Sequence, residues 1–387
     1  MIAGTGSYRS PVDGTRRSRR SRRADVVVVA AAGALVVAAA AVGRRLIADG
    51  ATLYLPFPPL LAQWLPHVGP GTPVAVVVAV VVVARGPAWA ERLPWRALPA
   101  LTGVAAAMWT LALALVDGWQ RGVVERLTSA DEYLHDVPGA PALVREFAGH
   151  ILTSAVDPDQ TWFWTTHVGA HPPGAFLVFV VLDRIGLGGG GVAGPLVIAV
   201  GASAAAAVLV TARAMGDEQV ARRAAPFAVL FPGAVWVGVS ADGLFACVLA
   251  WGVALLAVAT ARTGWRSGVA AAAAGLLIGG TVYLSYGLVL GGLLAAAVLV
   301  RPGAGRRLRV ATAGSRCGSD GRWGLGIDRA RWRALGFAAA GAAAVVAAFT
   351  LAGFSWLDGY AKVRVIYAAS IAAARPYSYF VWANLAA

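Results

Sequence analysis

The chain has 387 residues, of which 58% are hydrophobic and only 13% are charged, and its mean hydropathy is +0.68. This composition excludes an ordinary soluble domain. It predicts an all-α polytopic transmembrane bundle of about nine or ten membrane segments, because a spanning helix satisfies its own backbone hydrogen bonds. The net charge of +14 comes almost entirely from arginines that flank apolar stretches, which favours a positive-inside topology over binding to nucleic acid.

The N-terminal part is predicted to hold a basic arm and a first group of membrane helices. Residues 1–24 contain the run "RRSRRSRR" and are expected to form a cytoplasmic arm. The protein is accordingly predicted to be a multi-pass plasma-membrane protein with a cytoplasmic N-terminus. Residues 25–116 are expected to form the N-terminal transmembrane helices. The three spans expected there are 25–43, which would act as a signal anchor, then 73–84 and 98–116.

A long polar segment, residues 117–171, interrupts the apolar pattern and is rich in Asp and Glu. A loop of this length between spans is usually functional, so it is predicted to be an outer loop of catalytic type. Within it, "APALVREFAGHIL" has apolar residues at helical spacing and is expected to form an amphipathic helix along the membrane surface.

The C-terminal half returns to apolar segments, and residues 172–300 are predicted to be a transmembrane core. The basic loop 301–333 is expected in the cytoplasm. Residues 334–387 are expected to form a C-terminal transmembrane segment and a second outer loop, ending in "VWANLAA", which resembles the start of a further helix, so the fold is suspected to be incomplete there. The candidate segments within the core are 172–187, 192–211, 224–240, 243–261 and a pair in 267–300.

The number of crossings in the core must be odd if 117–171 is outside and 301–333 is inside. The candidate segments number six, so one of them is not a full crossing. Segment 172–187 is short and is interrupted by Asp183 and Arg184. It is therefore predicted to be re-entrant or to lie on the membrane surface.

The stretch "TSADEYLHDVP" gathers titratable groups just beyond a span. Asp131 and His135 would lie one helical turn apart, as would Glu132 and Asp136, so carboxylate and imidazole groups could converge. Such a group can act as a general base or bind a divalent cation. The alternative is a solvated acidic loop. The two cysteines, one in an apolar span and one in a basic loop, predict neither a disulfide nor a metal cluster.

The stretch "TWFWTTHVGAHPPGAF" places His167 and His171 four residues apart, a spacing that metal ligands use on a helix. Pro172 and Pro173 make a regular helix doubtful there and predict an abrupt start of the following helix. His171 would then lie at that helix's N-terminal end, where an anion such as phosphate is favoured. A metal held by Glu132, Asp136 and His171 is the second interpretation.

Other polar residues lie close to apolar spans, where burying a polar group in the membrane costs free energy and often marks a functional residue. Asp242 falls between two apolar spans and is either a functional acid or part of a helix N-cap. Tyr286, in the turn "TVYLSYG", and His135 are further candidates for binding the substrate or donor. In the second outer loop, Arg364, Arg375 and Tyr377 are either interfacial anchors or a clamp for the phosphate of a lipid-linked donor.

The layout of residues 98–300 resembles the C-type membrane glycosyltransferases, the superfamily of protein O-mannosyltransferases and lipid A aminoarabinose transferases. The resemblance rests on the "DE" pair early in the long loop, on "HPPG" at its end, and on a later Asp. It implies that Asp131 is the catalytic base with Glu132 as its neighbour, and that His171 contacts phosphate or metal. Asp242 matches the later Asp, and Arg364 and Arg375 would bind the donor.

Three functions follow from these observations. The first is a glycosyltransferase that moves a sugar from a polyprenyl-phosphate donor to a glycan, lipid or protein acceptor of the cell envelope, with inversion and with no cofactor beyond a candidate divalent cation. The second is a multi-span transporter or lipid flippase, although no repeat between halves is visible. The third is a membrane protein whose role is regulatory or whose activity has been lost.

Overall fold

The structure is a computed structural model that describes residues 12–140, 144–300 and 329–386. It is helical, and within these residues it contains no strand, which confirms the predicted all-α fold class. The chain divides into two compact units. The smaller unit consists of Met1–Pro66 and Tyr367–Ala387, and the larger unit is His67–Ile366.

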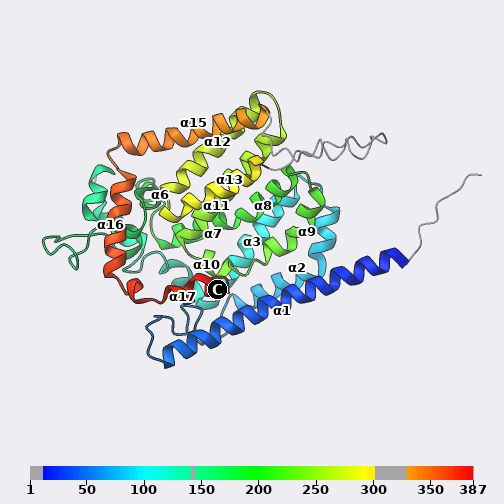
Figure 1. The fold of residues 1–387 in the computed structure, drawn as a ribbon, viewed down its shortest axis with the longest axis horizontal. Coiled ribbons are helices and arrows are strands. Elements are labelled where there is room, and N and C mark those ends of the chain that lie inside the picture. Colours follow the sequence, from blue (N-terminus) through cyan, green and yellow to red (C-terminus); the bar gives the residue numbers. More distant parts are fainter. Residues whose placement is uncertain (1–11, 141–143, 301–328, 387) are drawn as a thin grey trace, which may run out of the picture. The chain divides into compact units, whose positions relative to one another are not determined.

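The smaller unit is built on α1 (Val12–Ala48), the first helix in Figure 1. Helix α1 continues through the expected boundary between the basic arm and the signal anchor, so that boundary is not a helix end. The short helices η6 (Ile371–Ala374) and α17 (Tyr377–Ala383) complete the unit. The hydroxyl of Tyr379 donates a hydrogen bond of 2.9 Å to the carbonyl oxygen of Ala39, which fixes α17 against α1.

The larger unit carries the remaining elements, except that the last residues of α16 (Trp356–Ala369), from Tyr367, belong to the smaller unit. Its first part contains α2 (Thr72–Arg92), α3 (Leu98–Ala114), η1 (Leu115–Asp117), η2 (Gln120–Val124), α4 (Tyr133–Asp136), η3 (Val137–Gly139), η4 (Val144–His150) and α5 (Thr166–Ala170). Its second part contains α6 (Pro173–Arg184), α7 (Gly190–Ala202), α8 (Ala204–Ala214), α9 (Glu218–Val229), α10 (Ala234–Val237), α11 (Ala241–Ala261), α12 (Trp265–Val282), η5 (Tyr286–Leu290), α13 (Gly291–Val300), α15 (Arg329–Leu351) and α16 (Trp356–Ala369).

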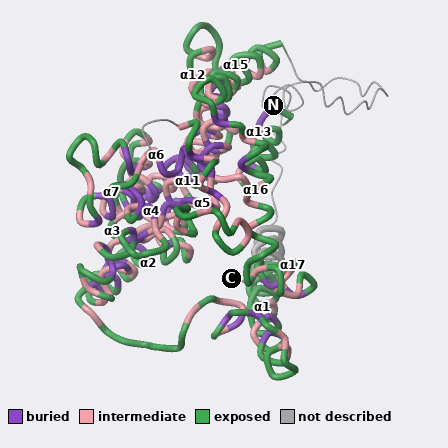
Figure 2. The backbone as a smooth tube through the Cα atoms, turned by 90° about the vertical axis from the view of Figure 1, so that its left-hand side faces the viewer, coloured by how far each residue is buried: buried purple, intermediate pink, exposed green. Residues whose placement is uncertain are grey.

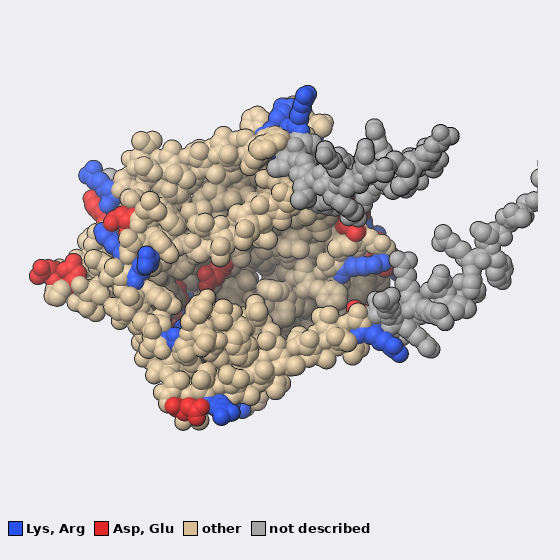
Figure 3. Space-filling view, in the orientation of Figure 1, with Lys and Arg blue, Asp and Glu red and all other residues tan. Residues whose placement is uncertain are grey.

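Helices of membrane-spanning length and composition support the assignment to the membrane. Among the described residues six qualify: Arg23–Ala48, Thr72–Arg92, Leu98–Asp117, Gly190–Ala214, Ala241–Ala261 and Arg329–Leu351. A shorter apolar helical stretch covers Tyr286–Val300. The face in Figure 3 is mostly uncharged, with Lys, Arg, Asp and Glu side chains gathered at a few places. The protein is therefore a membrane protein, with fewer full-length spans in the described residues than the nine or ten expected.

The larger unit has two ends, which we call the site end and the far end. The site end holds the described residues of 118–140 and 144–172, the start of α11 and the turn after α12, where Leu284 meets His171. The far end holds the last turns of α8, α11 and α13, which pack together through Met215, Leu256 and Leu299. The successive segments α7–α8, α9–α10, α11, α12 and η5–α13 run between these ends in alternating directions.

The odd number of crossings stays a prediction, because among the described residues of 172–300 only Gly190–Ala214 and Ala241–Ala261 have the length and composition of a full span. Helix α6 is only 12 residues long, and its Phe176 and Phe179 are buried at the site end, as expected for a segment that does not cross. The predicted span 224–240 is wrong as a single helix, because α9 stops at Val229 and the Pro232–Gly233 turn separates it from α10. The predicted surface helix in 140–152 is instead the 3-10 helix η4, and the loop 301–333 lies mostly outside the described residues.

Glycines allow α12 and α15 to approach closely. A Cβ at Gly275 would overlap the carbonyl oxygen of Ala338, and one at Gly341 would overlap that of Ala272. Lipid tails are as apolar as leucine, so helix association in a membrane depends on such close packing of small residues. The pair α12–α15 therefore relies on these glycines to keep α15 on the bundle.

Replacing Gly275 by alanine is expected to separate α12 from α15 and to destabilise the protein by about 1–3 kcal/mol, the usual effect of overpacking. The matched control is Gly280→Ala on the same helix, where an added Cβ meets no atom within 4 Å. The measurement is the melting temperature of both variants in detergent. Equal melting temperatures would show that the close approach does not stabilise the bundle.

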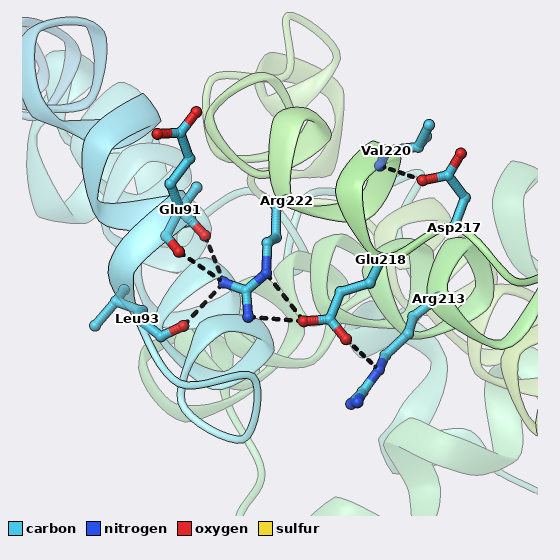
Figure 4. Close-up of polar contacts among 8 residues, drawn as sticks. Glu91, Leu93, Arg213, Asp217, Glu218, Val220 and Arg222 are labelled. Atoms are coloured by element: carbon cyan, nitrogen blue, oxygen red, sulfur yellow. Dashed lines mark hydrogen bonds and ion pairs between the residues drawn. The ribbon is translucent and has the colours of Figure 1, made fainter. Parts of the chain in front are cut away.

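An arginine fastens the C-terminal end of α2 to α9 at the far end. Arg222 donates from Nη1 to the carbonyl oxygens of Ala90 at 2.7 Å and Leu93 at 2.9 Å, and from Nη2 to Glu218 at 2.8 Å. Glu218 also accepts from Nε of Arg213 at 2.9 Å. Figure 4 shows the guanidinium of Arg222 between the two helices. The last carbonyls of α2, which have no partner within their own helix, are thus satisfied by a side chain from α9.

Arg222→Ala is expected to lower the melting temperature in detergent by roughly 5 °C, because hydrogen bonds to a charged group contribute about 1.5–3 kcal/mol. Its neighbour Arg223 is exposed, so Arg223→Ala is the control and should change the unfolding free energy by no more than about 0.5 kcal/mol. A comparable loss in both variants would mean that overall charge, and not the contact with α2, stabilises this end.

Candidate functional site

Tyr133 is the centre of the site end. Its side chain is 2% exposed, and its ring lies 5.1 Å from Phe179, 6.2 Å from His171, 6.4 Å from His167 and 6.5 Å from Phe245 between centroids. Figure 2 shows the buried residues concentrated where α4, α5, α6 and α11 meet. Burial raises the pKa of the Tyr133 hydroxyl, and the charges of Asp242 and Glu132 raise it further. The ring thus stays neutral and serves as a packed floor beneath the polar groups.

The acidic pair is held against the second polar stretch. Oε1 of Glu132 lies 2.9 Å from Nδ1 of His167. Oδ1 of Asp131 accepts a hydrogen bond of 3.0 Å from the Thr166 hydroxyl, and the carbonyl oxygen of Asp131 accepts the amide of His167 at 3.1 Å. Two stretches some forty residues apart are thus joined, and the charge of Asp242 acts on both His167 and His171. We call this group the acid–imidazole cluster: Asp131, Glu132, His167, His171 and Asp242.

The expected pairing of Asp131 with His135 on a helix does not occur. Helix α4 begins only at Tyr133, and Glu132 precedes it in an extended conformation. His135 is exposed. The helical spacing rule thus does not apply to Asp131, whose neighbours are set by the return of the chain at Thr166.

Asp136 has a structural role. It is 9% exposed, and its Oδ2 accepts the backbone amide of Thr165 at 2.8 Å. Among the described residues, no three His, Cys, Asp or Glu side chains are placed to hold a metal ion. Glu132, Asp136 and His171, the set considered for a divalent cation, are accordingly not gathered into one group of ligands.

His171 is positioned by the prolines that follow it. It is extended, Pro172 is the N-cap, and α6 begins at Pro173, as the sequence predicted. Its Nδ1 lies 3.1 Å from the carbonyl oxygen of Leu284. A carbonyl oxygen can only accept, so Nδ1 carries the hydrogen and Nε2 keeps its lone pair. A Cβ at Gly174 would collide with the carbonyl of Tyr283, so glycine is required for this close approach.

The two histidines differ in charge. Burial lowers the pKa of His171, against smaller opposing effects of the Leu284 hydrogen bond and Asp242. The hydrogen bond that His167 donates to Glu132 raises the pKa of His167, and the charges of nearby acids add to this. His167 is therefore the favoured cation, and its Nε2–H can be offered to an anion. The lowered pKa of His171 favours the neutral imidazole, whose Nε2 accepts a hydrogen bond. Such a group suits a hydroxyl better than the phosphate that the sequence predicted as its partner.

Asp242 lies at the opening of an apolar groove. It is the second residue of α11, and its amide donates to Oγ of Ser240 at 3.0 Å, so this acid belongs to an N-cap and is exposed as well. The groove has a volume of about 370 Å³. It is lined by Asp242, Phe245, Ala246, Leu249, Ala250, Ser285, Leu288 and Leu294. Because the His171 ring lies 5.6 Å from that of Phe245, the groove meets the acid–imidazole cluster.

The remaining predicted residues lie outside this groove lining. Tyr286 packs against Trp356 and Tyr360 of α16, at centroid distances of 5.2 and 5.6 Å. Arg364 is exposed on α16. Arg375 and Tyr377 lie in the smaller unit. Helix α16 itself contacts the long loop, since Nζ of Lys362 donates to the carbonyl oxygen of Ala148 at 3.0 Å.

Sequence reasoning did not single out three residues of the site. Phe245 forms the groove wall and contacts His171, and its position three residues after Asp242 on a helix could have indicated it. Ser285, which lines the groove, lies in the turn "TVYLSYG", where the sequence pointed only to Tyr286. Thr166 has no sequence signal, because its contact with Asp131 depends on how the loop returns.

The arrangement combines the carboxylate of Asp131, an imidazole whose pKa is raised (His167) and an imidazole whose pKa is lowered (His171) beside an apolar groove. Groups of this kind can remove a proton from a hydroxyl and stabilise an anionic leaving group. Comparisons with known protein families, with curated proteins and with solved structures found no match.

Proposed function

We propose that this protein transfers a sugar from a polyprenyl-phosphate donor to a hydroxyl group of an envelope glycan, lipid or protein. The observation that carries the proposal is the continuity between the apolar groove and the acid–imidazole cluster. A polyprenyl chain would lie along Leu249, Leu288 and Leu294, while the sugar and phosphate would reach Asp242 and the cluster. The groove thus suits a substrate that is apolar at one end and charged at the other.

Asp131 is the proposed base. Its carboxylate takes the proton of the acceptor hydroxyl as the acceptor oxygen attacks the anomeric carbon. The bond from that carbon to the phosphate oxygen breaks, the electron pair leaves with the phosphate, and the configuration is inverted. Glu132 keeps His167 protonated, and the imidazolium Nε2–H stabilises the developing phosphate charge.

His171 and Asp242 are proposed to bind the sugar. The neutral Nε2 of His171 and the carboxylate of Asp242 both accept hydrogen bonds, which suits sugar hydroxyl groups. Phe245, at the groove wall, offers an apolar surface to the ring. These contacts would orient the anomeric carbon, and correct orientation lowers the barrier of a two-substrate reaction.

The direct test supplies membranes that contain the protein with radiolabelled polyprenyl-phosphate mannose or arabinose. Transfer of label to an acceptor fraction is expected with one of these donors. Movement of labelled donor across reconstituted vesicles without transfer would indicate a transporter or flippase instead. If the protein neither transferred nor moved any such donor, this result would contradict both functions.

A further inference from the structure

A second apolar groove lies in the far half of the larger unit, well separated from the acid–imidazole cluster along α2 and α3. It has a volume of about 260 Å³ and lies between α2, α3 and α9. Its lining is almost entirely apolar and includes Val82, Trp89, Leu93, Val104, Met108 and Pro226. Because α2 and α3 are of spanning length, this groove faces the layer that lipid chains occupy.

Basic residues lie next in the chain to residues that line this groove. Arg85 precedes Gly86, Arg92 precedes Leu93, and Arg96 lies two residues before Leu98; Gly86, Leu93 and Leu98 all line the groove. The three arginines and Arg223 are exposed, and none of the four forms an ion pair within the part of the chain that the structure describes.

Glu91, which directly precedes Arg92, is exposed and offsets part of this positive charge, whereas two other acids at the far end are engaged elsewhere. Glu218 is shared between Arg213 and Arg222, and Asp217 accepts the amide of Val220 at 2.7 Å. Trp89 lines the groove and is 48% exposed, as is common for an indole at the boundary between lipid and water. Exposed cations therefore lie next in the chain to residues that line an apolar groove.

We propose that this groove binds an anionic phospholipid, with an acyl chain between α2, α3 and α9 and the phosphate at Arg85, Arg92 and Arg96. Arginine pairs with phosphate through two parallel hydrogen bonds, and basic residues at a membrane surface attract anionic lipids. A zwitterionic lipid would fill the same apolar volume without this attraction. The site is independent of the proposed sugar transfer.

The experiment is native mass spectrometry of the whole protein in detergent with dioleoyl phosphatidylglycerol or dioleoyl phosphatidylcholine, which differ only in the headgroup. The wild type is expected to retain phosphatidylglycerol preferentially. Arg85→Gln, Arg92→Gln and Arg96→Gln should each weaken retention of that lipid by about fivefold, the usual effect of one cation near a membrane surface. The control is the double variant Arg262→Gln, Arg266→Gln at the α11–α12 turn, which does not line the groove.

A second variant tests the apolar part. Val104 lines the groove and is 58% exposed, so Val104→Trp fills the groove without overpacking the interior and should reduce retention of both lipids. Ala100→Trp, at an exposed position of α3 outside the lining, should not. Equal retention of both lipids by the wild type, or an equal loss in the control double variant, would overturn the proposal. So would unchanged retention in Val104→Trp, since the lipid chain would then lie elsewhere.

Discussion

Asp131→Asn is expected to reduce the rate of sugar transfer by about 10²–10⁴-fold, the contribution typical of a positioned general base. The amide oxygen of asparagine can still accept from the Thr166 hydroxyl, so the contact that holds this position survives. Binding of the donor should change little, because the lost group acts on the acceptor. The measurement is initial rate against donor concentration, which separates kcat from KM.

The matched control is Asp159→Asn, an exposed acid of the same loop that takes no part in the cluster. It should transfer sugar at the wild-type rate. Transfer by Asp131→Asn at more than about one tenth of the wild-type rate would remove Asp131 as the base. Asp242→Asn would then be the next variant to test, since that carboxylate lines the groove.

Glu132→Gln is expected to move the alkaline limit of sugar transfer to lower pH. The hydrogen bond that His167 donates to Glu132 raises the pKa of His167, so in the wild type the imidazolium persists above the usual pKa of about 6.5 and is lost at higher pH. A neutral glutamine removes most of this effect, and His167 then deprotonates nearer its ordinary value. The measurement is kcat/KM across pH 5.5–9 for both proteins, a range chosen to include about 6.5.

His167→Gln gives the second arm of this experiment. It should lower transfer at all pH values and abolish the alkaline limit that His167 causes. An unchanged pH profile in both variants would contradict the assignment of His167 as the cation. A general loss of activity with the limit in place would indicate that Glu132 and His167 only support the fold.

The same pair affects stability with a definite sign. The folded-state pKa of His167 is raised, so the stabilisation from its contact with Glu132 is complete below pH of about 6.5 and is lost as pH rises through the raised value. His171 acts in the opposite direction. Its pKa is lowered by burial, so the folded state loses stability as pH falls below about 6.5. His167 therefore changes the stability above pH of about 6.5 and His171 changes it below about 6.5, so their combined contribution is greatest near this pH.

The membrane helices were largely predictable from composition and length. Segments such as 98–116 and 243–261 are long, apolar and bounded by charge or turn residues, and the structure has α3 and α11 in these places. The break in the 224–240 segment was not predicted, because a hydropathy average is insensitive to the way Pro232 and Gly233 end a helix. The odd number of crossings was predicted from the acidic loop 117–171 and the basic loop 301–333 and stays a prediction, but the segment 172–187 that was judged too weak to cross does contain α6, a helix of only 12 residues.

The site was predictable in its parts and not in its contacts. "DE", "HPPG" and Asp242 could be read from the sequence because each breaks an apolar pattern. The partners could not, since Glu132 meets His167 only through the return of a long loop. The different charges of His167 and His171 depend on burial and on the carbonyl of Leu284, more than a hundred residues away in the chain.

The contact of Arg222 with α2 has a consequence for biogenesis. The carbonyl oxygens of Ala90 and Leu93 bind the guanidinium of Arg222, which is synthesised about 130 residues later. During translation α2 and α3 enter the bilayer with that end still bound to water, and the hairpin becomes fastened only when α9 arrives. A nascent chain stopped before residue 222 should therefore leave this end open to protease, and a chain extended past α9 should close it.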